Sequence, residues 1–412
     1  MSDGHQSTSL EGEKHHLGDL GGRIVVLAGG VGIVALAVAI IISFFVDGGL
    51  TRFGLAYLTA FGIFLSISVG ALFFVIIQHL VRAGWSVVVR RLAEVMAANL
   101  MLLAILAVPI LILAPHIYHH WVHPGEDVVI LGKTAWLNLP FFVVRIIIYF
   151  AILVSLAWWF WHQSLAQDEN GGTEATHRMQ WWSGLALVVF GIVVMFMPMD
   201  LFMTLDAHWY STIFGVYFFA GGLIGFFAAI ILMLRFLQRN GLMKQAVTIE
   251  HYHDLGKFLF GFTFFWGYIA FSQYMLIWYA RIPEVANWYA TRGATTNPDT
   301  MPPAAGWAVV SLFLLFFHFL IPFAGQLSRW TKRHTGWLAF WAVWMLVAHA
   351  VDHYWLVMPE LKLGHMPIIV EVLCIVGIGG LWIAGVAKLA GERSLLPTRD
   401  PRLSESLALE NY

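Results

Sequence analysis

The sequence predicts an all-α integral membrane protein with ten transmembrane helices, and its composition, its hydropathy and the length of its apolar runs support this class. Of the 412 residues, 59% are hydrophobic and 11% are charged, which is less than half the roughly 25% charge of a typical soluble domain. The mean hydropathy is +0.76. Because so few polar residues cannot cover a soluble surface of this size, the composition excludes an ordinary soluble enzyme and a disordered protein.

Charge, cysteine content and motifs exclude further classes. The net charge of −1 offers no basic surface for nucleic acid. Cys374 is the only cysteine, which excludes a disulfide framework, a cysteine-ligated iron–sulfur cluster and a CxxCH haem attachment site. The sequence contains no Walker A motif, no glycine-rich dinucleotide fingerprint and no nucleophile elbow. Any chemistry must therefore use partner cofactors, protons or a lipid-soluble substrate.

Ten continuous apolar runs are long enough to cross the hydrocarbon core, which needs about 20 residues per helix. The runs cover residues 24–46, 54–78, 92–114, 139–162, 181–204, 210–235, 256–280, 306–327, 337–357 and 367–389. They are too long and too uniformly apolar for the short alternating strands of a membrane β-barrel.

An internal repeat predicts how these spans are grouped. Span 2 and span 6 share a Y-x-T-x-F-G start, at Tyr57 and at Tyr210, and several later matches at the same offset. Chance similarity between apolar segments is the alternative. A duplication implies two parallel four-helix bundles, spans 2–5 and spans 6–9, flanked by helices 1 and 10. The expected parts are a solvated tail (1–22), helix 1 (23–50), the first bundle (51–165, continuing to 204), the second bundle (205–360), helix 10 (361–390) and a second solvated tail (391–412).

The distribution of basic residues predicts the orientation. Of the 23 Lys and Arg residues, Arg145 falls within a span and most of the others fall on the side of the N-terminus. The opposite loops hold only Arg52, Lys133, Arg281, Arg292 and Lys362. By the positive-inside rule both termini are expected in the cytoplasm.

Ionisable residues inside the spans are candidates for function, because a charge in the bilayer is costly unless it is paired or solvated. His349, Asp352 and His353 follow an i, i+3, i+4 pattern and share one helix face near the middle of span 9. With other polar residues of the second bundle they predict a proton path from mid-membrane to the outer surface. The candidates are Asp200, Asp206, His208, Tyr274, His318, His349, Asp352, His353 and Glu371. The alternative is a hydrogen-bonded network that only fixes helix packing.

Other polar residues have alternative roles. His318 and His349 lie at depths where they could ligate a haem, although no spacing signature supports this. His116, His119, His120 and His123 fall in the outer loop after span 3, where a wet interface loop is favoured over a metal site. Glu94 is expected to cap span 3 or to face headgroups. Arg145 is expected to snorkel outward or to pair with a carboxylate of a partner.

Four segments carry a resemblance to a known family. They are MDLFMTLDAHWYSTIFGVYFFAGG (Met199 to Gly222), FSQYMLIWYARIPE (Phe271 to Glu284), LIPFAGQLSR (Leu320 to Arg329) and HAVDHYWLVMP (His349 to Pro359). These strings resemble the NrfD/PsrC-like membrane subunits of bacterial alternative complex III. The resemblance implies ten helices in two four-helix bundles, with both termini cytoplasmic, in the bacterial inner membrane.

The resemblance also implies partners. Such a complex oxidises menaquinol and passes electrons through iron–sulfur clusters and c-type haems on other subunits. The expected partners are the larger paralogous subunit (ActC), an iron–sulfur protein, a multi-haem c-type cytochrome and a terminal oxidase. The cofactors are expected on those partners, with no catalytic, cofactor-binding or metal-binding residue in this chain.

Two departures from the family pattern concern quinol binding. The larger paralogue carries a histidine in span 2 and an acidic residue in span 4, where this chain has Val69 and Arg145. The chain therefore resembles the smaller paralogue, ActF, and a scaffold that conducts protons is the first functional hypothesis. A quinol-oxidising subunit is the second, and an independent secondary transporter is the third.

Overall fold

The computed structural model describes residues 10, 12–280, 282–294, 306–362, 368–391 and 393–411, apart from the side chains of residues 283 and 284. Residues 1–9, Glu11 and Arg281 of the sequence analysis lie outside this part. The described residues contain no β-strand and ten helical segments that are long and apolar enough to cross a membrane. The prediction of an all-α, multi-pass membrane protein is confirmed.

Each predicted apolar run coincides with one of these segments. The unbroken ones are α1 (Asp19–Ser43), α2 (Gly49–Leu80), α9 (Leu139–Asn170), α11 (Phe214–Arg239), α12 (Ile249–Ala280) and α18 (Ile369–Ala390). Span 3 is built from α3 (Val87–Ala98), α4 (Leu100–Leu106) and α5 (Val108–Ile112), and span 5 from α10 (Glu174–Leu201) and η1 (Met203–Leu205). Span 8 is built from α14 (Trp307–Phe313), η2 (Leu314–Leu320) and α15 (Ile321–Gln326), and span 9 from α17 (Thr335–Val357) and η3 (Met358–Leu361).

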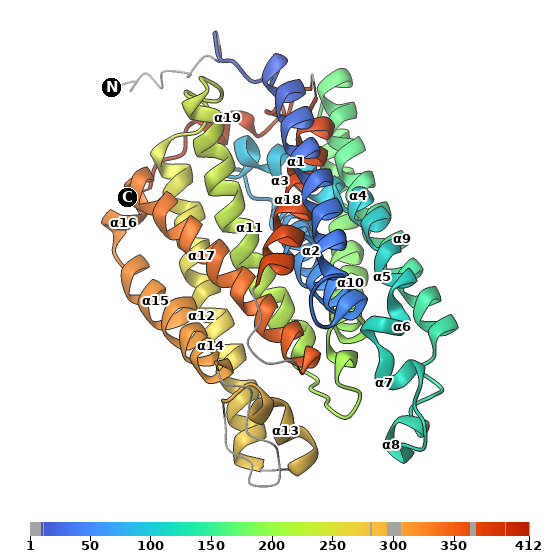
Figure 1. Ribbon diagram of the computed structural model, residues 1–412. Coiled ribbons are helices and arrows are strands. Elements are labelled where there is room, and N and C mark those ends of the chain that lie inside the picture. The colour runs from blue at the N-terminus through green and yellow to red at the C-terminus, as the bar shows by residue number, and fades with distance from the viewer. Residues whose placement is uncertain are drawn as a thin grey trace.

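Short helices close the two ends of this assembly (Figure 1). At one end, which we call the tail end, the described parts of both termini meet near α19 (Leu403–Leu407), and α16 (Arg329–Arg333) lies toward the same end. The opposite end, which we call the far end, holds α7 (His119–Val122), α8 (Val128–Leu131) and α13 (Pro283–Thr291), preceded by α6 (Ala114–Ile117). The sequence analysis anticipated none of these short helices.

The two helices related by the internal repeat, α2 and α11, pack against each other in the centre. Small residues permit the contact, as is common between membrane helices. A Cβ added at Gly70 would lie 2.7 Å from the carbonyl oxygen of Gly222, and one added at Gly222 would lie 2.7 Å from that of Ser66. The backbones of α2 and α11 therefore meet directly, with no side chain between them.

The remaining helices surround this central pair. Contacts run from α2 through α3, α9 and α10 back to α2, and from α11 through α12, the α14–α15 segment and α17 back to α11. Helix α18 packs on α2, and α1 packs on α18. These contacts are compatible with the two expected bundles and the two flanking helices, although the division into two bundles stays a prediction.

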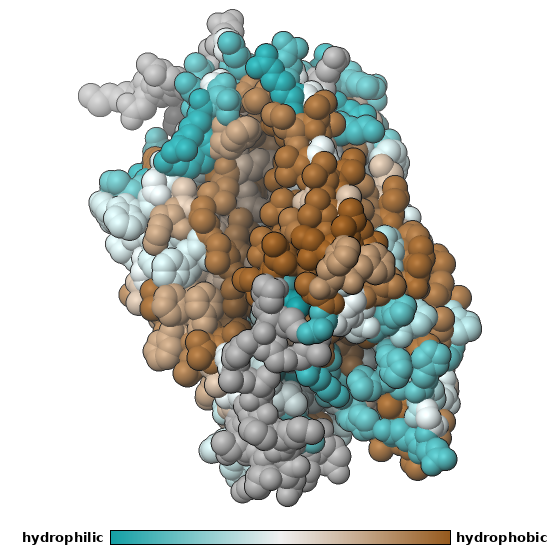
Figure 2. Space-filling view, viewed as in Figure 1, coloured by the Kyte–Doolittle hydropathy of each residue, from teal (hydrophilic) through white to brown (hydrophobic). Residues whose placement is uncertain are grey.

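The outer surface is apolar around the middle of the molecule. Figure 2 shows hydrophobic residues across the centre of one face, with hydrophilic residues gathered toward the two ends. Large aliphatic side chains on α1, α9 and α10 are more than half exposed, among them Val26, Ile33, Ile147, Val188 and Ile192. Such a surface is stable only against lipid or another apolar surface.

A buried ion network at the tail end corrects the expectation for Glu94. Its carboxylate accepts from Arg90 Nε at 3.4 Å and from Arg91 Nε at 3.1 Å. Arg90 also pairs with Asp400, and Arg91 pairs with Asp168 at 2.7 Å. Glu94 thus neither caps a helix nor faces headgroups. Because these charges neutralise one another, α3 begins earlier than its apolar run predicted.

Both tails make contacts at the tail end that the prediction of solvated tails did not include, while residues such as Lys14 and Arg399 stay exposed. The Glu13 carboxylate accepts from the backbone N–H groups of Lys244, Gln245 and Ala246 at 2.8, 2.5 and 3.1 Å. The N–H of Leu395 donates to the carbonyl of His15 at 2.7 Å. These contacts could not be predicted, because short polar segments carry no periodicity.

Replacing Glu13 by alanine is expected to loosen the loop between α11 and α12. Three N–H groups would lose a charged acceptor, and hydrogen bonds to charged groups contribute about 1.5–3 kcal/mol each before solvent compensates. We expect trypsin to cleave after Lys244 about ten-fold faster, a change of about 1.4 kcal/mol in local opening. Glu410→Ala removes an exposed carboxylate at the same end and is the control. Equal cleavage of both variants would show that the Glu13 contacts do not hold the loop.

Candidate functional site

His349, Asp352 and His353 form a buried cluster, which we call the triad, on the face of α17 that packs against α2 and α11. None of the three is more than 1% exposed. Glycines of α11 leave room for the imidazoles. A Cβ at Gly225 would lie 3.0 Å from His349 Cδ2, and one at Gly221 would lie 3.4 Å from His349 Cε1. A side chain at Gly225 would therefore press on the imidazole of His349, whereas Gly221 is in ordinary contact distance.

Hydrogen bonds tie the triad to both central helices. The hydroxyl of Tyr217, on α11, donates to Asp352 Oδ1. On α2, the hydroxyl of Ser66 donates to the carbonyl of Ile63 at 2.8 Å, so its oxygen accepts from His349 Nε2–H at 2.9 Å. The network thereby assigns the proton of His349 to Nε2. Removing either helix would leave the triad with unpaired polar groups.

Several imidazole nitrogens around the triad have no partner among the described residues. These are Nδ1 of His349, Nε2 of His353 and both ring nitrogens of His318. His353 Nδ1 donates to the carbonyl of His349 at 3.1 Å. The Nε2 of the neutral His353 ring is then unprotonated and carries a free lone pair. His318 lies on the π-helical turn η2, with its ring centre 3.9 Å from that of Trp266. Such turns are frequent at functional sites. The site thus holds basic nitrogens that can accept protons.

The triad is also the one group of three potential metal ligands in the described part of the chain. One atom from each member of the triad lies within 4.8 Å of the others. Two imidazoles and a carboxylate are a common donor set for transition metals. The histidines of the outer loop do not converge in this way, although the rings of His119 and His123 are 5.5 Å apart.

A second chain of polar side chains lies toward the far end. The hydroxyl of Ser211, which is half-buried, donates to Gln273 Oε1 at 3.0 Å, and Gln273 Nε2 donates to the Tyr289 hydroxyl at 3.0 Å. The hydroxyl of Tyr217 contacts the triad, and no hydrogen bond joins it to Tyr289 among the described residues. Burial raises the pKa of the Tyr289 phenol, which therefore keeps its proton and can donate it in a hydrogen bond.

Helix α13, which carries Tyr289, is anchored over the far-end part of α17. The guanidinium of Arg292 donates to the carbonyls of Trp355 at 3.1 Å and Leu356 at 2.9 Å. It also pairs with Glu360 at 3.2 Å and lies 3.7 Å from the ring centre of Trp288. The cation satisfies carbonyls at the end of α17 and so fixes the position of Tyr289.

Asp200 belongs to a different site from the triad. Both of its carboxylate oxygens accept from Arg145, Nε at 2.8 Å and Nη2 at 2.9 Å. Tyr149 and Trp136 donate to the same oxygens at 2.7 and 3.0 Å. Arg145 therefore does not snorkel outward. The carboxylate that pairs with it is Asp200 of this chain and not a residue of a partner subunit.

Two other candidates lie in separate places. Glu371, at the start of α18, forms a buried pair with Arg52 at 2.9 Å. His208 Nε2 lies 2.8 Å from the Asp127 carboxylate in an exposed pair at the far end. The pKa of Asp127 is below its usual value, chiefly because the N–H of Ile130 donates to its carboxylate. Such an exposed pair is in contact with water and cannot itself form a membrane-embedded path.

The last two candidates are also structural in their contacts. Asp206 accepts from the backbone N–H groups of His208 and Trp209 at 3.0 and 3.3 Å and shapes the connection before α11. The Tyr274 hydroxyl donates to the carbonyl of Ala294 at 2.9 Å. Of the nine predicted residues, the structure thus brings four together, the triad and His318, and places the other five elsewhere.

The sequence analysis missed the hydroxyl partners of the triad. Tyr217 lies in an aromatic stretch of α11, and Ser66 lies among small residues of α2, so neither stands out by charge. The nearby glycines were the available signal, because Gly221 and Gly225 fall one and two turns after Tyr217 on the same helix. Tyr289 lies on α13, a helix that the hydropathy pattern does not reveal.

Comparison of the chain with protein-family models and with curated proteins finds no match in either. The resemblance to NrfD/PsrC-like subunits therefore depends on the four sequence segments. The segment from 271 to 284 includes Arg281, which lies outside the described residues. The functional argument depends mainly on the geometry of the triad.

Proposed function

We propose that this chain is a membrane subunit of a quinol:electron-acceptor oxidoreductase of a bacterial respiratory chain, in which it scaffolds the complex and conducts protons. The observation that carries the proposal is the triad, three buried protonatable groups of α17 with unpartnered imidazole nitrogens, packed against the two central helices. A network that served packing alone would gain most from paired nitrogens, because each unpaired buried polar atom costs about 1–3 kcal/mol.

The chemistry of the triad suits proton transfer. An imidazole can accept a proton on one nitrogen while it releases another from the opposite nitrogen. His349 is arranged for this sequence, since Nδ1 is free to accept and the Nε2–H points at the oxygen of Ser66. Asp352 accepts from the hydroxyl of Tyr217, and in the proposal water carries protons between this hydroxyl and the far end. In the proposal, protons enter from the far end, which by the positive-inside rule is the outer end.

The scaffolding role rests on the surface and on the resemblance. The wide apolar surface can pack against partner helices as well as lipid. In the proposed complex, the partners are the larger paralogue ActC, an iron–sulfur protein, a multi-haem c-type cytochrome and a terminal oxidase. This chain holds no cofactor in the proposal. Menaquinol, iron–sulfur clusters and c-type haems belong to the partners, and both termini are cytoplasmic.

A cavity near Asp200 favours quinol binding as the second candidate. It has a volume of about 330 Å³ and is lined by Trp136, Met203, Trp209 and Tyr210 together with Asp200, a size within the usual range for ligand pockets. The carboxylate is already occupied by Arg145, Tyr149 and Trp136, which makes this candidate weaker than the first. Retention of menaquinone by the purified chain, lost on Met203→Trp, would favour it.

Replacing Asp352 by asparagine is expected to uncouple the complex. The amide keeps the size of the side chain and can accept from Tyr217, but it cannot take up a proton. In proteoliposomes that contain the whole complex, we expect proton translocation to fall at least about ten-fold, the lower range for losing an acid–base group, while quinol oxidation continues. Asp254→Asn, at a carboxylate of α12 paired with Lys257 at the tail end, is the control. Unchanged translocation in Asp352→Asn would make the triad structural.

Purification in mild detergent tests the wider assignment. Multi-haem c-type and iron–sulfur polypeptides should accompany the chain in fixed ratio and give visible absorption. A colourless protein that is isolated alone, folded and active in transport would support the transporter hypothesis instead. A stoichiometric transition metal, lost on His349→Ala, would replace the proton role of the triad by metal binding.

A further inference from the structure

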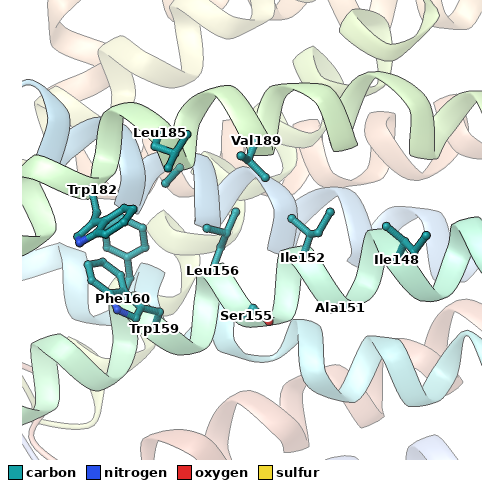
Figure 3. Close-up of a pocket in the computed structure, with 11 residues that line it drawn as sticks. Ile148, Ala151, Ile152, Ser155, Leu156, Trp159, Phe160, Trp182, Leu185 and Val189 are labelled. Carbon is teal, nitrogen blue, oxygen red and sulfur yellow. The ribbon is translucent and has the colours of Figure 1, made fainter.

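A long apolar groove runs between α9 and α10 on the outer surface, away from the triad. Its volume is about 590 Å³. Figure 3 shows branched aliphatic side chains of both helices along its length and the rings of Trp159, Phe160 and Trp182 at one end. Small side chains leave the space open between the helices, namely Ala151, Ser155 and Ala186. Ser155 supplies the single hydroxyl of this lining.

The groove has the length of one lipid leaflet. From Ile148 to Phe160 it follows α9 for about 18 Å, at 1.5 Å per residue, and half of a hydrocarbon core of about 30 Å is about 15 Å. The aromatic end faces the tail end, because α9 continues from Phe160 to Asn170, where the tail-end residues Asp168 and Arg91 pair. The groove therefore spans the leaflet on the side of the tails.

Polar and aromatic residues continue beyond this end of the groove. Arg178 is exposed, and its Nη1 lies 3.5 Å from Gln163 Oε1, a weak contact at the limit of a hydrogen bond. Trp181 is 74% exposed beside it. Exposed tryptophan and arginine at one level are typical of the headgroup region. A ligand in the groove would thus meet a cation where its apolar part ends.

We propose that the groove binds one acyl chain of an anionic phospholipid from the tail-side leaflet, with the phosphate at Arg178. The lining excludes a polar ligand. The groove is narrow, branched and apolar apart from the Ser155 hydroxyl, which fits a flexible acyl chain. This inference is independent of the proposed function, since no residue of the groove belongs to the triad.

Filling the groove tests the acyl-chain part. We would titrate the purified full-length chain in detergent with phosphatidylglycerol and with phosphatidylcholine of the same acyl chains, and count bound lipids by native mass spectrometry. Ser155→Trp should weaken the binding of both lipids at least about five-fold, by loss of about 1 kcal/mol or more of apolar contact. Ile147→Trp places the same side chain on the exposed face of α9 outside the groove. This variant should bind both lipids as strongly as the unmodified protein does.

Changing the charge tests the headgroup part. The unmodified protein should prefer phosphatidylglycerol about five-fold, and Arg178→Gln should abolish the preference without weakening phosphatidylcholine, since one basic residue near an anionic headgroup contributes about 1 kcal/mol. Arg239→Gln, at another exposed arginine of the tail end, should keep the preference. Equal binding of both lipids by the unmodified protein, or full binding by Ser155→Trp, would overturn the proposal.

Discussion

Replacing Asp200 by alanine is expected to destabilise the protein by about 3–5 kcal/mol, the usual cost of leaving one partner of a buried ion pair alone. The guanidinium of Arg145 would lose two hydrogen bonds while 4% exposed. Tyr149 and Trp136 would lose their acceptor as well. Chemical or thermal unfolding of the purified protein in one detergent would measure the change.

The matched control replaces both charges. Arg145→Met with Asp200→Leu leaves no buried charge, and such exchanges are often neutral or stabilising. We expect the double variant to unfold close to the unmodified protein, although the Tyr149 hydroxyl stays unpaired. If Asp200→Ala were as stable as the double variant, the pair would be solvated in the membrane and the buried geometry would be incorrect.

Valine in place of Gly222 is expected to cost at least about 3 kcal/mol and to disrupt the triad from a distance. Overpacking usually costs about 1–3 kcal/mol where side chains can yield. Here the added Cβ would meet the backbone oxygen of Ser66 at 2.7 Å, and α2 must move to relieve the clash. That movement separates Ser66 from His349, so proton translocation should fall along with stability.

Gly191→Val is the control for this variant. Gly191 also lies within a transmembrane helix, α10, but nothing lies within 4 Å of a Cβ added there. Its unfolding and proton translocation should match the unmodified protein. A Gly222→Val protein that also matched would mean that α2 and α11 do not touch through their backbones.

The fold could be predicted because the membrane imposes a simple rule. A helix that satisfies its own backbone in hydrocarbon needs a long apolar run, and such runs are visible in the sequence. What failed were the parts to which this rule does not apply. The contacts of Glu13, the helix α13 and the burial of Asp400 all involve polar segments outside the hydrocarbon, where contacts specific to this chain decide the structure.

The site could be predicted within one helix but not between helices. The i, i+3, i+4 spacing placed the triad correctly on one face of α17, because helical geometry fixes it. Asp200 could not be assigned in the same way. Its partner Arg145 lies on another helix, α9, and no spacing rule relates residues 55 positions apart. Hydroxyl partners of the triad such as Tyr217 could not be predicted for the same reason.

The polar content of α17 has a consequence for biogenesis. With α12, the α17 segment has the lowest mean hydropathy of the ten spans, and charged or strongly polar residues near a helix centre oppose release from the translocon into lipid. The groups that satisfy its polar face, Ser66 and Tyr217, belong to helices that are synthesised earlier. Helix α17 should therefore insert efficiently only when α2 and α11 are already in the membrane, so that the order of synthesis protects the most polar span from lipid.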